Sequence, residues 1–146
     1  MFEAIYTAVQ QVNANEDIQL NNSIKCPKRR VLLREGSGII TLAGPSSCCP
    51  CNQFFRYQIT LNGNMATPTT GTPGAIDVGL MLNGGEVQSS IAENTTAAVD
   101  EYDNFSVTAV VDVPNGQFAT VSFRNLTLNN GAILTKNVNV VVDQKN

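Results

Sequence analysis

The chain has 146 residues, of which 42% are hydrophobic and only 14% are charged, and its formal net charge at pH 7 is −3. This length suits one domain over residues 1–146, which buries roughly 68% of the surface that the unfolded chain exposes. The acidic balance argues against general binding of nucleic acid, and no apolar run of about 18 residues is present to span a membrane. We therefore expect neither nucleic acid nor a membrane as a partner.

Apolar side chains recur at every second position in short runs, a period typical of β-strands that bury one face. Turn-forming residues separate the runs, and the chain shows no linker and no heptad pattern. Residues 1–30 form a candidate N-terminal strand or arm of the domain. The expected strands, eight to ten in number, cover residues 4–12, 18–21, 31–34, 39–43, 55–61, 76–82, 87–91, 105–113, 121–123 and 138–142.

Residues 104–124 carry the clearest of these patterns, with apolar side chains at Phe105, Val107, Ala109, Val111 and Val113. Polar residues fill most of the positions between them, so one face of the strand can be buried while the other meets water or a partner. Pro114-Asn115-Gly116 then interrupts the run, and alternation resumes afterwards. Asn and Gly tolerate the positive φ angles of tight turns, so this segment predicts a β-hairpin.

Similar turn signals follow other runs, at Asn62-Gly63-Asn64 and Asn83-Gly84-Gly85. Residues 66–74, which are rich in Thr, Pro and Gly, are expected to form a loop, and residues 92–103 a second loop with one helical turn at 96–100. So many short antiparallel strands in one domain predict an all-β protein, an antiparallel β-sandwich or jelly roll that wraps two sheets over one core.

The sequence offers little that could carry out catalysis. It contains no histidine, the side chain that most often transfers protons near neutral pH, so a serine triad in its usual form is excluded. The neighbouring carboxylates Asp100 and Glu101, or Glu16 and Asp17, could in principle serve a glycosidase, but adjacent carboxylates on a loop are more often solvated surface. We therefore predict no catalytic residue, no cofactor and no enzymatic activity.

Four cysteines form the one cluster with a plausible chemical role: Cys26, Cys48, Cys49 and Cys51. A zinc site is disfavoured because Cys26 stands alone and Cys48 and Cys49 are adjacent, which makes tetrahedral coordination awkward. A disulfide from Cys26 would link the segment before residue 31 to the loop before residue 54, and four cysteines allow three full pairings. Free thiols remain the alternative, and they are expected first if the protein assembles in a reducing cytosol.

A basic stretch contains Lys25, Lys28, Arg29, Arg30 and Arg34. It could contact an acidic capsid lattice or nucleic acid. Ordinary solvation is the preferred interpretation, because no aromatic residues are interleaved for base stacking.

Several short motifs resemble a group of small proteins encoded by gut Firmicutes and their phages. They are Arg34-Glu35-Gly36-Ser37-Gly38-Ile39 with Thr41-Leu42, the Cys-rich turn followed by Arg56-Tyr57, residues 97–102, and Asp112-Val113-Pro114-Asn115-Gly116. The resemblance extends from about Tyr6 to Val142, with a departure at Leu33, where a histidine is common. It implies a jelly roll like that of tumour necrosis factor (TNF) and the C1q head, assembled as a homotrimer, in virion proteins such as head fibres or capsid decorations.

Apolar residues on the outward faces of strands also favour a homo-oligomer. If residues 105, 107 and 109 face the core, Val110 faces outward, and the same argument applies to the other strands. The candidate subunit contacts are Phe54, Arg56, Met81, Val110 and Val141. The alternative is that these are the single exposed apolar side chains that any protein surface carries.

Two classes of function follow. The first is a non-enzymatic structural protein of the virion, a homotrimer that contacts the capsid or another virion protein. The second is a filament subunit of a bacterial cell surface or spore appendage, crosslinked by its cysteines. A carbohydrate-binding module is a distant third, since sugar sites usually use exposed aromatic residues and the chain has no Trp. Residues 1–4 lack the layout of a secretion signal, so we expect either use without Sec export or prior removal of a leader.

Overall fold

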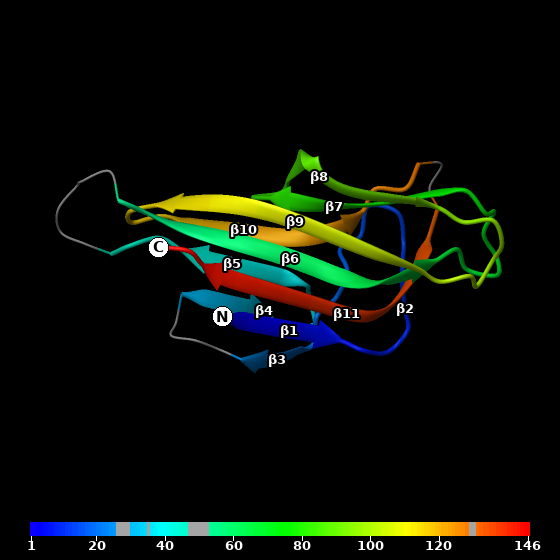
Figure 1. Ribbon diagram of the computed structural model, residues 1–146, viewed down its shortest axis with the longest axis horizontal. Helices are drawn as coiled ribbons and strands as arrows, with labels where there is room; N and C mark the ends of the chain where they lie inside the picture. Colours follow the sequence, from blue (N-terminus) through cyan, green and yellow to red (C-terminus); the bar gives the residue numbers. More distant parts are fainter. Residues whose placement is uncertain (26–29, 35, 47–52, 129–130) are drawn as a thin grey trace.

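The computed structural model describes residues 1–25, 30–34, 36–46, 53–128 and 131–146. These residues form eleven strands, which pair antiparallel into two sheets packed face to face (Figure 1). The predicted all-β antiparallel sandwich is therefore confirmed. The count exceeds the expected eight to ten because the predicted strand 4–12 is two short strands separated by residues 7–9, and because an unpredicted strand covers residues 22–25, whereas residues 18–21 form none.

The six-stranded sheet has the order β3-β1-β11-β6-β9, with β2 paired to β11. Its strands are β1 (Phe2–Tyr6), β2 (Gln10–Val12), β3 (Asn22–Lys25), β6 (Phe54–Ala66), β9 (Asp103–Pro114) and β11 (Ile133–Gln144). The five-stranded sheet has the order β4-β5-β10-β7-β8. Its strands are β4 (Val31–Arg34), β5 (Ile39–Ala43), β7 (Ala75–Leu82), β8 (Gly85–Thr95) and β10 (Phe118–Asn125).

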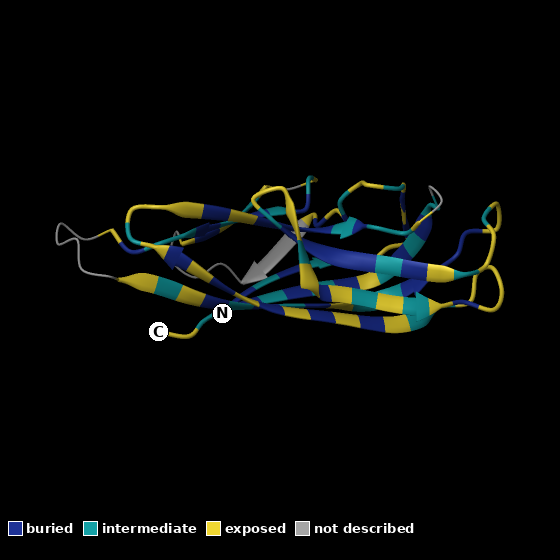
Figure 2. Ribbon diagram, turned by 90° about the horizontal axis from the view of Figure 1, so that it is seen from above, coloured by how far each residue is buried: buried dark blue, intermediate teal, exposed yellow. Residues whose placement is uncertain are grey.

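The core lies between the sheets and is built from alternate residues of most strands, among them β1, β5, β6, β7, β9, β10 and β11, as the banding of buried and exposed positions in Figure 2 shows. Strand β9 follows the predicted alternation without exception: its odd-numbered residues 105–113 are buried, and residues 104–112 at even positions are exposed. Tyr57 is the largest fully buried side chain, and its hydroxyl donates a hydrogen bond to the carbonyl of Ala43 at 2.5 Å. This bond joins β6 of one sheet to β5 of the other.

The predicted hairpin at Pro114-Asn115-Gly116 is wrong in its pairing, although the turn is present. Strand β9 pairs with β6, whereas β10 pairs with β5 and β7, so the turn carries the chain from one sheet to the other. Its backbone is bonded outside the two strands: Asn115 N–H donates to Gln53 O at 3.0 Å, and Gly116 N–H to Pro45 O at 2.8 Å. Two strands with alternating apolar residues can bury them equally well as a hairpin within one sheet or as an arch, in which the turn connects the two sheets. The hydrogen bonds to Gln53 and Pro45 hold the turn in the arch.

Three further local predictions differ from the structure. Residues 62–64 do not end a strand but lie within β6, where a Cβ on Gly63 would meet the ring of Phe105 at 3.0 Å. Residues 92–95 belong to β8, and residues 96–100 form no helical turn. Residues 18–21 are not a strand, because the chain here crosses from one sheet to the other: Gln10 of β2 bonds Gln19, and Ile18 N–H donates to Phe123 O at 2.7 Å.

Asn125 at the end of β10 is completely buried and joins three segments. Its amide nitrogen donates to the carbonyl oxygens of Val12 at 3.0 Å and Gly131 at 2.8 Å, and its carbonyl oxygen accepts from Thr127 N–H at 3.0 Å. One side chain thereby satisfies three backbone groups, one buried and two partly buried, from three segments.

We predict that Asn125→Ala lowers the free energy of unfolding by about 2–4 kcal/mol, because two carbonyls and one amide that are buried or partly buried lose their partners. Urea denaturation monitored by circular dichroism measures this loss. The exposed Gln11→Ala serves as the control and should change stability by less than about 0.5 kcal/mol. Equal effects of the two substitutions would contradict the role assigned to Asn125.

Asp77 of β7 is an unfavourably placed carboxylate. Burial raises its pKa, and Glu93, directly opposite on β8, raises it further by charge and by a side-chain hydrogen bond, with a smaller effect from Glu86. Among the described residues, its Oδ1 atom is buried and has no hydrogen-bond partner. The ionised form is therefore less stable in the folded chain than in the unfolded one.

Because the folded-state pKa of Asp77 is raised, the folded chain loses stability as the pH rises from the unfolded-state pKa through the folded-state value. We predict that Asp77→Asn is more stable than the unmodified chain at pH 7, and that the difference shrinks on acidification to about pH 4. Thermal unfolding across this pH range measures the difference. A gap that stays constant with pH would show that ionisation of Asp77 is not its cause.

Candidate subunit interface

The outer face of the six-stranded sheet, hereafter the outer face, consists of the side chains of β1, β6, β9 and β11 that point away from the core. Strand pairing places them in rows that run across the sheet. From β6 and β9 they are Phe54, Arg56, Gln58, Thr60, Asn62, Asn64, Asn104, Ser106, Thr108, Val110 and Asp112; from β1 and β11 they are Glu3, Ile5, Leu134, Lys136, Asn139, Val141 and Asp143.

The middle of this face is poor in charge. One row runs through Val141, Thr60 and Thr108, and the next through Asn139, Asn62 and Ser106. The hydroxyls of Thr60 and Thr108 lie 3.5 Å apart. The charged side chains are Glu3, which lies next to Val141 at the end of the first row, Asp143 and Lys136 on β11, and one pair on β6 and β9.

That pair is Arg56 with Asp112, directly opposite each other. Arg56 Nε lies 2.8 Å from Oδ1 of Asp112, and a terminal guanidinium nitrogen lies 2.8 Å from Oδ2, so the contact is bidentate. The guanidinium hydrogen bond lowers the pKa of Asp112, and the carboxylate raises the pKa of Arg56. The guanidinium also lies 5.3 Å from the centre of the Phe54 ring. The planar pair thus has a fixed orientation at one end of the face.

A shallow polar hollow of about 450 Å³ lies at the other end of the face. Asn64 donates to Asn104 across β6 and β9, and Asn137 donates to Asn64 at 3.3 Å from β11. Asn62, Gly63, Phe105 and Ser106 complete its lining. Asn137 has a positive φ of 53°, at the point where the pairing of β11 with β6 shifts register. The sequence alone does not reveal this cluster, because only the strand register makes these asparagines neighbours.

Four of the five candidate subunit contacts lie on this one face: Phe54, Arg56, Val110 and Val141. Val110 is 60% exposed and Phe54 38% exposed. The fifth, Met81, is a correction: it lies in β7 of the other sheet, is only 6% exposed, and is not available to a partner. Its outward position followed from the period of two, but alternation alone does not reveal that an outer face is covered.

The four cysteines Cys26, Cys48, Cys49 and Cys51 lie outside the described residues, as do Lys28 and Arg29 of the basic stretch. Within the described ranges, no group of three or more acidic, Cys or His side chains is arranged to hold a metal ion. Over the same ranges, no helix has the length and apolarity needed to cross a membrane. The outer face is therefore the surface on which four of the predicted contact residues come together.

Comparison with known proteins gives the fold a wider context. No protein-family model and no curated protein sequence matches the chain. Among solved structures, the globular domain of zebrafish complement 1qA superimposes with a TM-score of 0.53 at 8% identity, covering 96% of this chain and 94% of that one. Murine APRIL at pH 5.0 superimposes with a TM-score of 0.50 at 10% identity, covering 92% of this chain and 97% of that one. The C1q-like and TNF-like jelly-roll fold is thereby confirmed.

The Arg56–Asp112 pair makes a testable electrostatic prediction. Since the guanidinium holds the pKa of Asp112 below its ordinary value, Arg56→Gln should raise that pKa toward the ordinary range. The stabilisation from the pair is present at neutral pH and is lost as the pH falls through the folded-state pKa of Asp112. A carbon-detected NMR titration of the Asp112 carboxyl measures the shift. Arg34→Gln is the control and should leave it unchanged; an unchanged Asp112 in Arg56→Gln would refute the pairing in solution.

Proposed function

We propose that the chain is a non-enzymatic structural protein that assembles as a homotrimer through the outer face. The observation that carries this proposal is the set of Phe54, Val110 and Val141 on one charge-poor sheet face, with Val110 left 60% exposed. Interface centres are depleted in charge, and apolar side chains on them gain from being covered. The fold shared with C1q-like and TNF-like domains supports the threefold arrangement.

The second part of the proposal is location. We propose that the trimer is a component of a phage virion, either decorating the capsid or forming part of a head fibre. Support comes from the short motifs around Arg34-Glu35-Gly36, Arg56-Tyr57 and Asp112–Gly116, which resemble virion proteins of gut Firmicutes phages. The chain also offers a second sheet face, carrying Phe118 and Leu32, that remains outside the proposed trimer.

The subunit interface is tested by Val110→Lys, which places an ammonium group where neighbouring subunits would desolvate it. Analytical ultracentrifugation should give three times 15.6 kDa for the unmodified chain and 15.6 kDa for the variant. The matched control is Phe118→Lys, an exposed apolar residue (69%) at the start of β10 on the other sheet, which should leave the trimer intact. An unmodified chain that sediments as a monomer at micromolar concentration would overturn the interface.

The location is tested separately by immunogold electron microscopy on phage particles and host cells from one culture. Label on the capsid or its fibres is the expected result. Label confined to a cell surface or a spore appendage would replace the virion assignment with the filament alternative, whatever the oligomeric state.

A further inference from the structure

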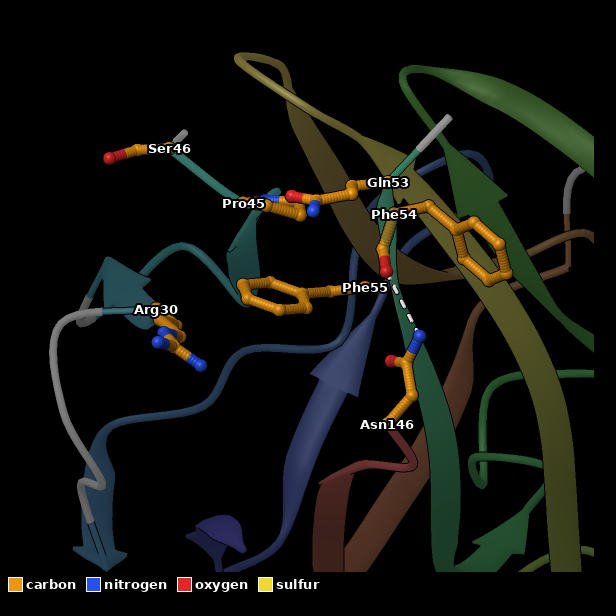
Figure 3. A pocket seen from close by; sticks show the side chains of 7 residues that line it. All are labelled: Arg30, Pro45, Ser46, Gln53, Phe54, Phe55 and Asn146. Carbon is orange, nitrogen blue, oxygen red and sulfur yellow. Dashed lines mark hydrogen bonds between the residues drawn. The ribbon is translucent and has the colours of Figure 1, made fainter. Parts of the chain in front are cut away.

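A second hollow, of about 590 Å³, lies at the end of the sandwich where β6 begins (Figure 3). Its described lining comes from four places in the chain: Arg30 before β4, Pro45 and Ser46 after β5, Gln53 to Phe55 at the start of β6, and Asn146. The volume is within the range of sites that hold small molecules. The ring of Phe55 projects into the hollow, whereas the ring of Phe54 points away toward the outer face.

The apolar wall of the hollow is held in place from behind. The Phe55 ring packs edge-on against Tyr57, with ring centres 6.4 Å apart and planes at 85°, and Tyr57 is fixed by its hydrogen bond to Ala43. Pro45, which is itself buried, lines the hollow beside this ring. Because the Phe55 ring is already held by these contacts, little of its side-chain freedom is left to lose when a ligand binds against it.

The polar rim is equally well supported. The side-chain amide of Asn146 donates to Phe54 O at 2.9 Å and accepts from Arg56 N–H at 2.7 Å, which extends the pairing beyond β11. Arg30 lies over the Phe55 ring, 4.5 Å from its centre, and donates one hydrogen bond to Gln144 at 3.2 Å. Both side chains are thus positioned before any ligand arrives.

The hollow contains one cationic side chain. Arg30 is the charged side chain among the described lining residues, and within the described ranges no side-chain or terminal carboxylate forms an ion pair with its guanidinium. A guanidinium carries five N–H donors in a planar fork, and one bond to a neutral amide leaves most of them available. The group that matches such a fork is a carboxylate.

We propose that this hollow binds a small carboxylate that carries a flat apolar group, such as an aromatic acid. The carboxylate would occupy the free side of Arg30, and the flat group would lie against Phe55. The same chemistry is offered by a free aromatic acid and by a chain that ends in an aromatic residue. The site lies beside the proposed subunit interface and does not depend on it.

NMR titration of the ¹⁵N-labelled full chain with benzoate provides the test. The expected result is saturable shifts of the amides of residues 53–55 and 146 and of the Arg30 side chain. The neutral isostere benzamide should bind at least about tenfold more weakly, since it cannot form the charge-assisted pair. N-acetyl-phenylalanine distinguishes the sources: binding as tight as benzoate indicates a chain terminus, and weaker binding indicates a free acid.

Two substitutions of Arg30 test whether its guanidinium binds the carboxylate. Arg30→Gln should weaken benzoate at least about tenfold, and Arg30→Lys, which keeps the charge but not the fork, by a smaller factor. Arg34→Gln, at the end of β4 and outside the hollow, should bind as the unmodified chain does. Thermal unfolding checks that each variant folds. The proposal is overturned if benzamide binds as well as benzoate, if Arg34→Gln weakens binding as much as Arg30→Gln, or if millimolar benzoate shifts none of these residues.

Discussion

The structure depends on one constraint: every second side chain of most strands in each sheet must be buried in the one core between the two sheets. Strand β9 shows it most simply, since every second residue from Phe105 to Val113 is buried. The constraint fixes which side chains remain outside as firmly as it fixes the core, because a register slip by one residue would exchange the two sets. The set of side chains on the outer face is therefore a consequence of core burial. The proposed subunit interface is formed by these outward-pointing side chains.

The two sheets treat their outer sides differently. On the five-stranded sheet, the following segment folds back: a Cβ on Gly79 would lie 2.5 Å from the side chain of Leu126, and Met81 and Ser122 are buried. Arg124 is joined to Asp17 at 2.9 Å across the same side. The six-stranded sheet keeps its central rows open, with threonine, asparagine and valine in place of covering segments. Of the two faces, it is the one whose composition and exposed central rows suit contact with another copy of the chain.

The sequence predicted the all-β class and the alternation of individual strands, because both depend only on neighbouring residues. Pairing was harder to predict, since Pro114-Asn115-Gly116 satisfies the rules for a hairpin and also for an arch between sheets. Bonds to Gln53 and Pro45, which lie far away in the chain, decide between them. The same limit applies to Met81. Alternation predicted that its side chain points away from the core, but it could not show that this side chain is buried. This limit also explains the asparagine hollow, which exists only once β6, β9 and β11 are placed in register.

At the start of β6, two adjacent phenylalanines contribute to two different surfaces, because successive side chains of a strand point to opposite sides. Phe54 and Phe55 are adjacent, so their side chains lie on opposite sides of the sheet, and each is paired with an arginine. Arg56 over Phe54 is neutralised by Asp112 and belongs to the outer face. Arg30 over Phe55 has a neutral partner, Gln144, and belongs to the hollow. A cation beside an aromatic ring is therefore a structural contact in the first case and a candidate recognition element in the second. The difference lies in the charge of the neighbouring side chain rather than in the arginine–phenylalanine contact itself.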